Sequence, residues 1–168
     1  GNYKLQPRLA RDVVERGPVN YLPDTTIANS GITRFQRIQQ VLHSDLMKAG
    51  EDFTSDMSYI LNDTVDVRGV ITMPNGLSYA GDGDKFIVAD QNGGPWSSVL
   101  VYAAGSDDVN EDPFPTLYEG DLVQFRAKVI EFTTANSNMT ELEVIGLIDI
   151  LDVAQPLPPV SIVATGDL

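Results

Sequence analysis

The stretch Thr64-Val-Asp-Val-Arg-Gly-Val-Ile-Thr-Met73 predicts a β-strand, because Val65, Val67, Gly69, Ile71 and Met73 alternate with more polar residues. Gly69 removes a side chain in mid-strand, which permits strong coiling or a bulge. A second stretch, Tyr118-Glu-Gly-Asp-Leu-Val-Gln-Phe-Arg-Ala-Lys-Val-Ile-Glu-Phe132, repeats the alternation. It begins with a Glu-Gly-Asp turn and continues as a predicted long strand over Leu122–Thr133.

Three shorter segments complete the pattern. They are Lys85–Asp90, Ser97–Ala103 and Met139–Leu151, and the last contains a second internal glycine, Gly146. Five strands with coil-permitting glycines and a longer connection between the third and fourth indicate a mainly β protein built as a five-stranded OB-fold-like barrel. A β-sandwich is the alternative, but that fold usually needs about seven strands.

The rest of the chain frames this barrel. We expect an N-terminal arm or linker over residues 1–31, the OB-fold-like domain over 32–152, and a Pro-rich exit linker over 153–168. Within the domain, Gly31–Gly50 has two interpretations: helical spacing of its apolar residues, or a bulged strand over Arg34–Leu42. A short helix is also expected over Leu46–Ala49.

The charge is unevenly distributed along the chain. Residues 1–50 hold seven basic and four acidic side chains (+3), and residues 51–168 hold four basic and twenty acidic (−16), which together give −13. The acidic surface repels phosphates and argues against a general nucleic-acid clamp. The chain has no cysteine, so disulfides and thiolate metal sites are excluded. No run of 18 apolar residues predicts a membrane span.

The sequence offers no catalytic constellation, and we expect a non-enzyme. His43 is the single histidine, and neither a phosphate-binding loop nor a nucleophile elbow occurs. Asp82 and Asp84 flank a glycine, and Asp90 follows the strand, so these carboxylates are a weak candidate for Ca²⁺. A solvated turn is the simpler interpretation, and no other cofactor is expected.

A barrel of this kind usually binds ligands across its second and third strands and the flanking loops. Aromatic and basic side chains there would bind a single-stranded nucleic acid or an oligosaccharide. The candidate ligand-binding residues are Tyr79, Lys85, Trp96 and Tyr102. Trp96 has an alternative role as a cap on the end of the barrel. The outward basic residues Arg68, Arg126 and Lys128 face the acidic Asp66, Glu141 and Glu143, so cross-strand ion pairs are predicted.

An ordered series of short motifs carries a resemblance to a known group of domains. The series is Arg37-Ile-Gln-Gln-Val41, Asp63–Thr72, Lys85-Phe-Ile-Val-Ala-Asp90 with Gly93-Gly94, Val99-Leu-Val-Tyr102, Glu119-Gly-Asp-Leu-Val123 and Thr140-Glu-Leu142. It resembles the OB-fold-like accessory modules of secreted bacterial nucleases and of exported multidomain proteins of Bacteroidetes-type bacteria.

The resemblance covers roughly residues 36–150. It implies a non-catalytic module of a secreted, cell-surface or periplasmic protein, with a neighbouring domain of the same polypeptide as partner. It also implies that Arg37–Val41 joins the barrel as a strand. A purely structural or protein-interaction module is the alternative function.

Overall fold

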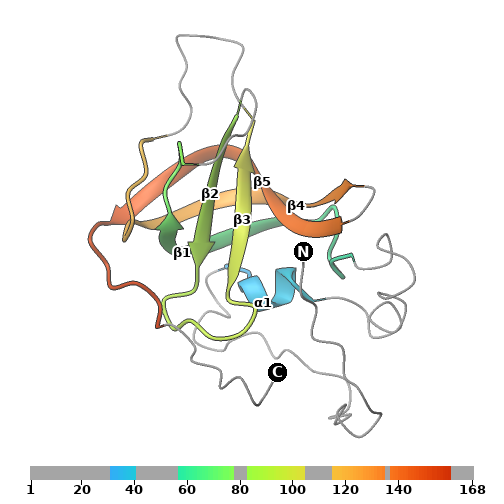
Figure 1. Cartoon of the computed structure of the whole chain (residues 1–168), viewed down its shortest axis with the longest axis horizontal. Helices are drawn as coiled ribbons and strands as arrows, with labels where there is room; N and C mark the ends of the chain where they lie inside the picture. Colours follow the sequence, from blue (N-terminus) through green and yellow to red (C-terminus); the bar gives the residue numbers. More distant parts are fainter. Residues whose placement is uncertain (1–30, 41–56, 78–82, 105–114, 135–136, 160–168) are drawn as a thin grey trace, which may run out of the picture.

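The computed structural model describes residues 31–40, 57–77, 83–104, 115–134 and 137–159 (Figure 1). They form one short helix, α1 (Phe35–Ile38), and the strands β1 (Thr64–Met73), β2 (Asp84–Ala89), β3 (Ser98–Ala103), β4 (Leu122–Thr134) and β5 (Ser137–Asp152). All five predicted strands are confirmed, with ends that differ from the prediction by about two residues at most. The helix α1 is too short to cross a membrane, and the described ranges hold no other α-helix.

The strands close into a barrel in the order β1-β2-β3-β5-β4, with β4 paired back to β1. All neighbours are antiparallel except β3 and β5, which run parallel through Leu100↔Glu141 and Tyr102↔Glu143. The parallel pair requires a crossover between the third and fifth strands, as in a Greek-key barrel. The predicted OB-fold plan is therefore confirmed by the connectivity itself.

Alternating residues of every strand fill the barrel. The inward set is Val65, Val67, Ile71, Phe86, Val88, Val99, Val101, Val123, Phe125, Ala127, Val129, Leu142 and Ile148. At its centre the rings of Phe86 and Phe125 meet edge to face, with centroids 5.8 Å apart. Burial of each such side chain stabilises the fold by about 1.5–3 kcal/mol, so this set is the main source of stability.

Gly69 marks the closest approach between β1, β2 and the helix. A Cβ atom there would lie 2.6 Å from the Ala89 carbonyl oxygen, 2.7 Å from Val88 Cγ2 and 2.9 Å from Phe35 Cε2. The glycine thus lets the two strands and the Phe35 ring pack without a side chain between them. The irregularity in β1 comes later, between Ile71 and Met73, where the register with β2 shifts.

The expectation that Arg37–Val41 forms a strand is wrong for its described part. Residues 35–38 form α1, and its Phe35 and Ile38 are buried in the barrel core at the lower end in Figure 1. The helical spacing of the apolar residues therefore decides the local structure, because it places both side chains on one face. Ser58 holds the helix end, since its hydroxyl donates to the Ile38 carbonyl at 2.6 Å. Val41, His43 and the expected helix over residues 46–49 lie outside the described residues.

The β4–β5 hairpin is longer than the barrel is tall. β1 pairs with β4 only as far as Lys128, and β3 pairs with β5 only over residues 141–143. Beyond these positions the two strands pair with each other down to Thr134↔Ser137. The hairpin end, residues 131–134 and 137–140, projects beside the barrel (Figure 1).

The segment after β5 returns along the barrel. Residues 153–159 are neither helix nor strand, as expected for a Pro-rich exit. The backbone amide of Gln155 donates a hydrogen bond to the Gly120 carbonyl at 2.8 Å, and Pro159 packs against Gly93 in the β2–β3 loop. This exit segment therefore contacts two connections of the barrel before the described residues end.

Candidate ligand-binding face

Lys85 and Tyr102 lie side by side on the outside of the barrel. They are direct partners in the β2–β3 register, and their sequence neighbours Phe86 and Val101 point into the core. The Tyr102 ring packs over Gly83, where an added Cβ would lie 2.8 Å from Tyr102 Cε2. The structure thus brings together two of the predicted ligand-binding residues.

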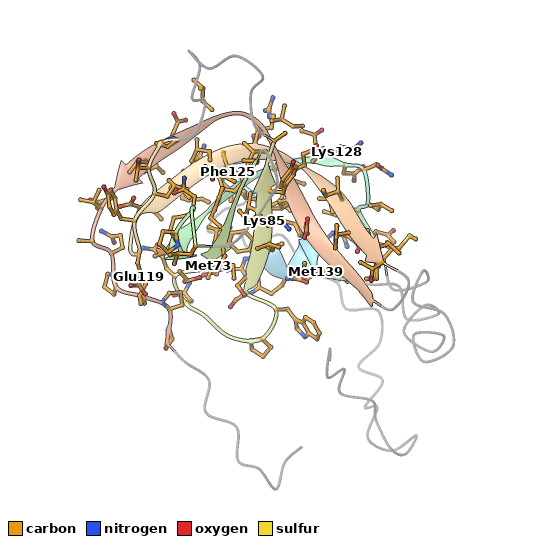
Figure 2. All side chains as sticks on the ribbon, turned by 45° about the horizontal axis from the view of Figure 1, so that its top comes forward. Met73, Lys85, Glu119, Phe125, Lys128 and Met139 are labelled. Atoms are coloured by element: carbon orange, nitrogen blue, oxygen red, sulfur yellow. The ribbon has the colours of Figure 1, made fainter. Side chains whose placement is uncertain are left out.

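The projecting hairpin adds an apolar pair to this surface. Phe132 and Met139 face each other across β4 and β5, and they are 50 % and 42 % exposed. The Lys85 ammonium lies 5.4 Å from the centroid of the Phe132 ring, within the range of a cation–π contact. Lys85 and Met139, both labelled in Figure 2, lie near the place where β3 and β5 run in parallel.

We call this surface the outer face. Its members project outward from β2, β3, β5 and β4, and they are Lys85, Ile87, Leu100, Tyr102, Phe132, Met139, Glu141 and Glu143. Register pairing orders them in rows, with Lys85 beside Tyr102 and Glu143, and Ile87 beside Leu100 and Glu141. The face is therefore mixed: aromatic and aliphatic groups surround Lys85 and two carboxylates, and Lys128 of β4 is the register partner of Glu143 at its edge.

Glu141 is buried within the outer face. The residue is 3 % exposed, its direct neighbours are the apolar Leu100 and Ile130, and its Oε1 has no hydrogen-bond partner among the residues that the structure describes. Burial raises the pKa of the Glu141 carboxyl, the Lys85 ammonium opposes that rise, and the charge of Glu131 adds to it. A buried carboxylate oxygen without a donor is costly and calls for an explanation.

The other predicted ligand-binding residues lie elsewhere. Trp96 is 70 % exposed in the β2–β3 loop, with a positive φ of 60°. That loop follows Ala89, four residues along β2 from Lys85, which is about 13 Å along the strand. Trp96 is therefore at the opposite end of the hairpin, and its side chain is not buried as a barrel cap would be. Tyr79 lies outside the described residues.

The candidate calcium ligands are not brought together where they are described. Asp84 begins β2 and accepts a hydrogen bond from the Asn75 amide at 3.0 Å. Asp90 follows the far end of β2 and accepts from the Asn92 backbone at 2.9 Å, which closes a local turn. Asp82 lies outside the described residues, and the described ones contain no group of three metal-ligating side chains.

The predicted cross-strand ion pairing is confirmed for Asp66 and Arg126. These register partners join through two hydrogen bonds of 2.9 and 3.1 Å, and the hydrogen bond to Arg126 lowers the pKa of the Asp66 carboxyl. Arg68 donates instead to the Gln124 side chain at 2.6 and 3.0 Å. Lys128 and Glu143 are register partners across β4 and β5, whereas the register partners of Glu141 are the apolar Leu100 and Ile130.

The ligand-binding prediction missed most residues of the outer face, among them Phe132, Met139 and the buried Glu141. A signal for Phe132 was present, because outward positions of its strand continue at every second residue from Gln124 through Lys128 to Phe132. A large aromatic residue on an outward position is informative. No sequence pattern predicts the contact between Phe132 and Lys85. Their strands, β4 and β2, are not adjacent in the sheet, and the two side chains meet only in the folded barrel.

Comparisons with known proteins give structural matches only. No family model and no curated protein sequence matches the chain. Among solved structures, OBody AM3L09 bound to hen egg-white lysozyme is 22 % identical over 56 % of this chain and 87 % of its own, with a TM-score of 0.41.

Two further matches are similar in extent. The mitochondrial single-stranded DNA-binding protein Rim1 of S. cerevisiae is 17 % identical over 56 % of this chain and 99 % of its own, with a TM-score of 0.41. A chain assigned as an aspartyl-tRNA synthetase of Leishmania major Friedlin is 21 % identical over 56 % of this chain, with a TM-score of 0.39, and this chain spans only 19 % of it. The fold of this chain accordingly rests on its own strand order and register.

Proposed function

We propose that this chain is a non-catalytic binding module that holds a polypeptide partner on its outer face. The observation that carries the proposal is the exposed pair of Phe132 and Met139, which lies beside Lys85 and Tyr102 and not in the barrel core. Aromatic residues and methionine are enriched at the centres of protein interfaces. An apolar pair on a projecting hairpin supports such an interface.

The charge on and around the outer face favours a polypeptide over a phosphate backbone. Lys85 is accompanied by Glu141 and Glu143, and the chain carries a net charge of −13. A polyanion gains affinity from the cations that neutralise its phosphates, and over the whole chain 24 carboxylates outnumber 11 lysine and arginine side chains. A partner with apolar and cationic side chains fits this surface better.

Single-stranded nucleic acid is the second candidate ligand. Two aromatic side chains, Tyr102 and Phe132, lie near one lysine, which is the combination that stacks bases and contacts a phosphate. This candidate predicts strongly salt-dependent binding, and it requires the local Lys85 to outweigh the surrounding carboxylates.

The export of the protein and the accessory role of this module remain part of the same proposal. They are supported by the ordered motifs of the sequence and by its Pro-rich segment after Asp152. Cell fractionation of the full-length protein, and assays of the full-length protein with and without residues 31–159, test both points. Activity of a neighbouring domain should survive removal of the module if the module is not catalytic.

The polypeptide proposal is tested by peptides selected on the folded chain from a displayed random library. Their affinities are measured by fluorescence anisotropy, in parallel with a fluorescein-labelled single-stranded oligothymidylate. Phe132→Ala should weaken the selected peptides by about 30-fold, since truncation of an interface anchor costs about 2 kcal/mol. Tyr118→Ala is the matched control, because Tyr118 is an exposed aromatic residue of the β3–β4 connection.

Peptides that bind Phe132→Ala as tightly as the wild type would overturn the proposal, and so would the recovery of no binding peptides. Oligothymidylate binding that is lost in Phe132→Ala, without peptide binding, would establish the second candidate. Circular dichroism of each variant shows that the fold is intact.

A further inference from the structure

The Lys85 side chain spans the middle of the outer face. Its strand, β2, is separated from β4 by β3 and β5 in the barrel order, yet its ammonium reaches the Phe132 ring on β4. Three strand spacings in a flat sheet amount to about 14 Å, so the contact depends on the curvature of the barrel sheet. Lys85 thus crosses over the two strands that carry Leu100 and Glu141.

The Lys85 ammonium does not satisfy the hydrogen-bonding capacity of the nearby Glu141 carboxylate. It lies over the Phe132 ring, but Glu141 Oε1 beneath this face accepts no hydrogen bond in the described structure. The apolar neighbours Leu100 and Ile130 supply no donor to that oxygen. The site therefore has an aromatic face and a buried acceptor, and Lys85 engages only the first by direct contact.

A guanidinium would satisfy both parts. Its plane stacks on an aromatic ring, while its N–H groups donate to a carboxylate along the edge of that plane. An ammonium has no planar face to stack and cannot reproduce this geometry. The second carboxylate of the face, Glu143, lies next to Glu141 on the same side of β5 and adds to the electrostatic attraction for a guanidinium.

We propose that the polypeptide partner inserts an arginine side chain between Phe132 and Glu141, and that Lys85 is an internal occupant displaced by it. This inference rests on the proposed function and specifies the chemistry of its partner. The charge of −16 over residues 51–168 favours the approach of a cationic segment. Lys85, on a long flexible stem, swings toward solvent when the arginine enters.

The proposal makes Lys85 a competitor of the partner, so its removal should strengthen binding. The probes are a fluorescein-labelled decapeptide of alternating arginine and serine, and the same peptide with neutral citrulline in place of arginine. We expect the wild-type chain to bind the arginine peptide at least about tenfold more tightly than the citrulline peptide. Lys85→Ala should tighten binding of the arginine peptide by about three- to tenfold.

Two further variants separate this mechanism from a general charge effect. Arg68→Ala removes the same charge from β1, where Arg68 contacts Gln124, eight residues along β4 from Phe132, and should change the affinity by less than about twofold. Glu141→Gln keeps the shape of the buried side chain but removes its charge, and should weaken the arginine peptide by about tenfold.

Weaker or unchanged binding by Lys85→Ala would overturn the inference, as would equal tightening by Arg68→Ala or equal affinity for the citrulline peptide. Deletion of residues 1–30 that tightens the peptide as much as Lys85→Ala would assign the site to the chain's own N-terminal segment and also overturn it. The peptides selected on the chain still test the proposed function in each of these cases, because their dependence on Phe132 is measured separately.

Discussion

A Gly69→Ala substitution is expected to lower the free energy of unfolding by about 3 kcal/mol or more. The added methyl group would lie 2.6 Å from the Ala89 carbonyl oxygen, 2.7 Å from Val88 Cγ2 and 2.9 Å from Phe35 Cε2. Real Cβ contacts are not found this close, so β2, α1 or both must shift.

The magnitude follows from which atoms have to move. Overpacking a core by a methylene usually costs about 1–3 kcal/mol, when side chains adjust in their rotamers. Here one of the three contacts is a backbone carbonyl of the neighbouring strand, whose position is fixed by the register Val70↔Ala89. A shift of that strand also disturbs the packing of Phe35 in the barrel end, which places the cost at the upper limit or above.

Urea denaturation followed by far-ultraviolet circular dichroism measures this loss, with the slope compared between variants. Gly146→Ala is the matched control, because Gly146 has a positive φ of 89° and no atom of the described residues lies within 4 Å of an added Cβ. Its cost is conformational alone and should be about 1–2 kcal/mol. A Gly69→Ala variant that loses no more stability than Gly146→Ala would refute the packing argument.

Three further outcomes are expected. Phe35→Ala should cost about 3–5 kcal/mol in the same assay, against less than about 0.5 kcal/mol for the exposed Leu77→Ala; equal losses would place α1 outside the core. Asn75→Ala should cost about 1–2 kcal/mol and speed hydrogen exchange at the Leu117 amide, which donates to the Asn75 side chain at 2.9 Å; unchanged exchange would contradict this. Because burial raises the pKa of Glu141, its ionised form opposes folding, so stability should rise as pH falls from 7 toward the ordinary value of 4.5. Glu141→Gln should be more stable than the wild type at pH 7, with a difference that shrinks over that range; a constant difference would contradict the assignment.

The candidate site was only partly predictable. Lys85 and Tyr102 follow from position, since both are outward residues of the second and third strands. Trp96 was a candidate for its chemistry, but it lies in the loop that begins after Ala89, about 13 Å along β2 from Lys85. Phe132 and Glu141 lie on β4 and β5, and they belong to the candidate site because Lys85 of β2 lies near them. No local sequence pattern predicts that proximity.

The sequence by itself determined the strands and the barrel, because an alternating pattern specifies which face of each strand is buried wherever the chain folds. It also determined α1, where the helical spacing of Phe35 and Ile38 prevailed over the expectation of a strand. The tertiary structure decided what Gly69 and Glu141 do. Both depend on the distance between strands that are remote in sequence, and that distance is set by barrel closure and by the curve of the β4–β5 hairpin.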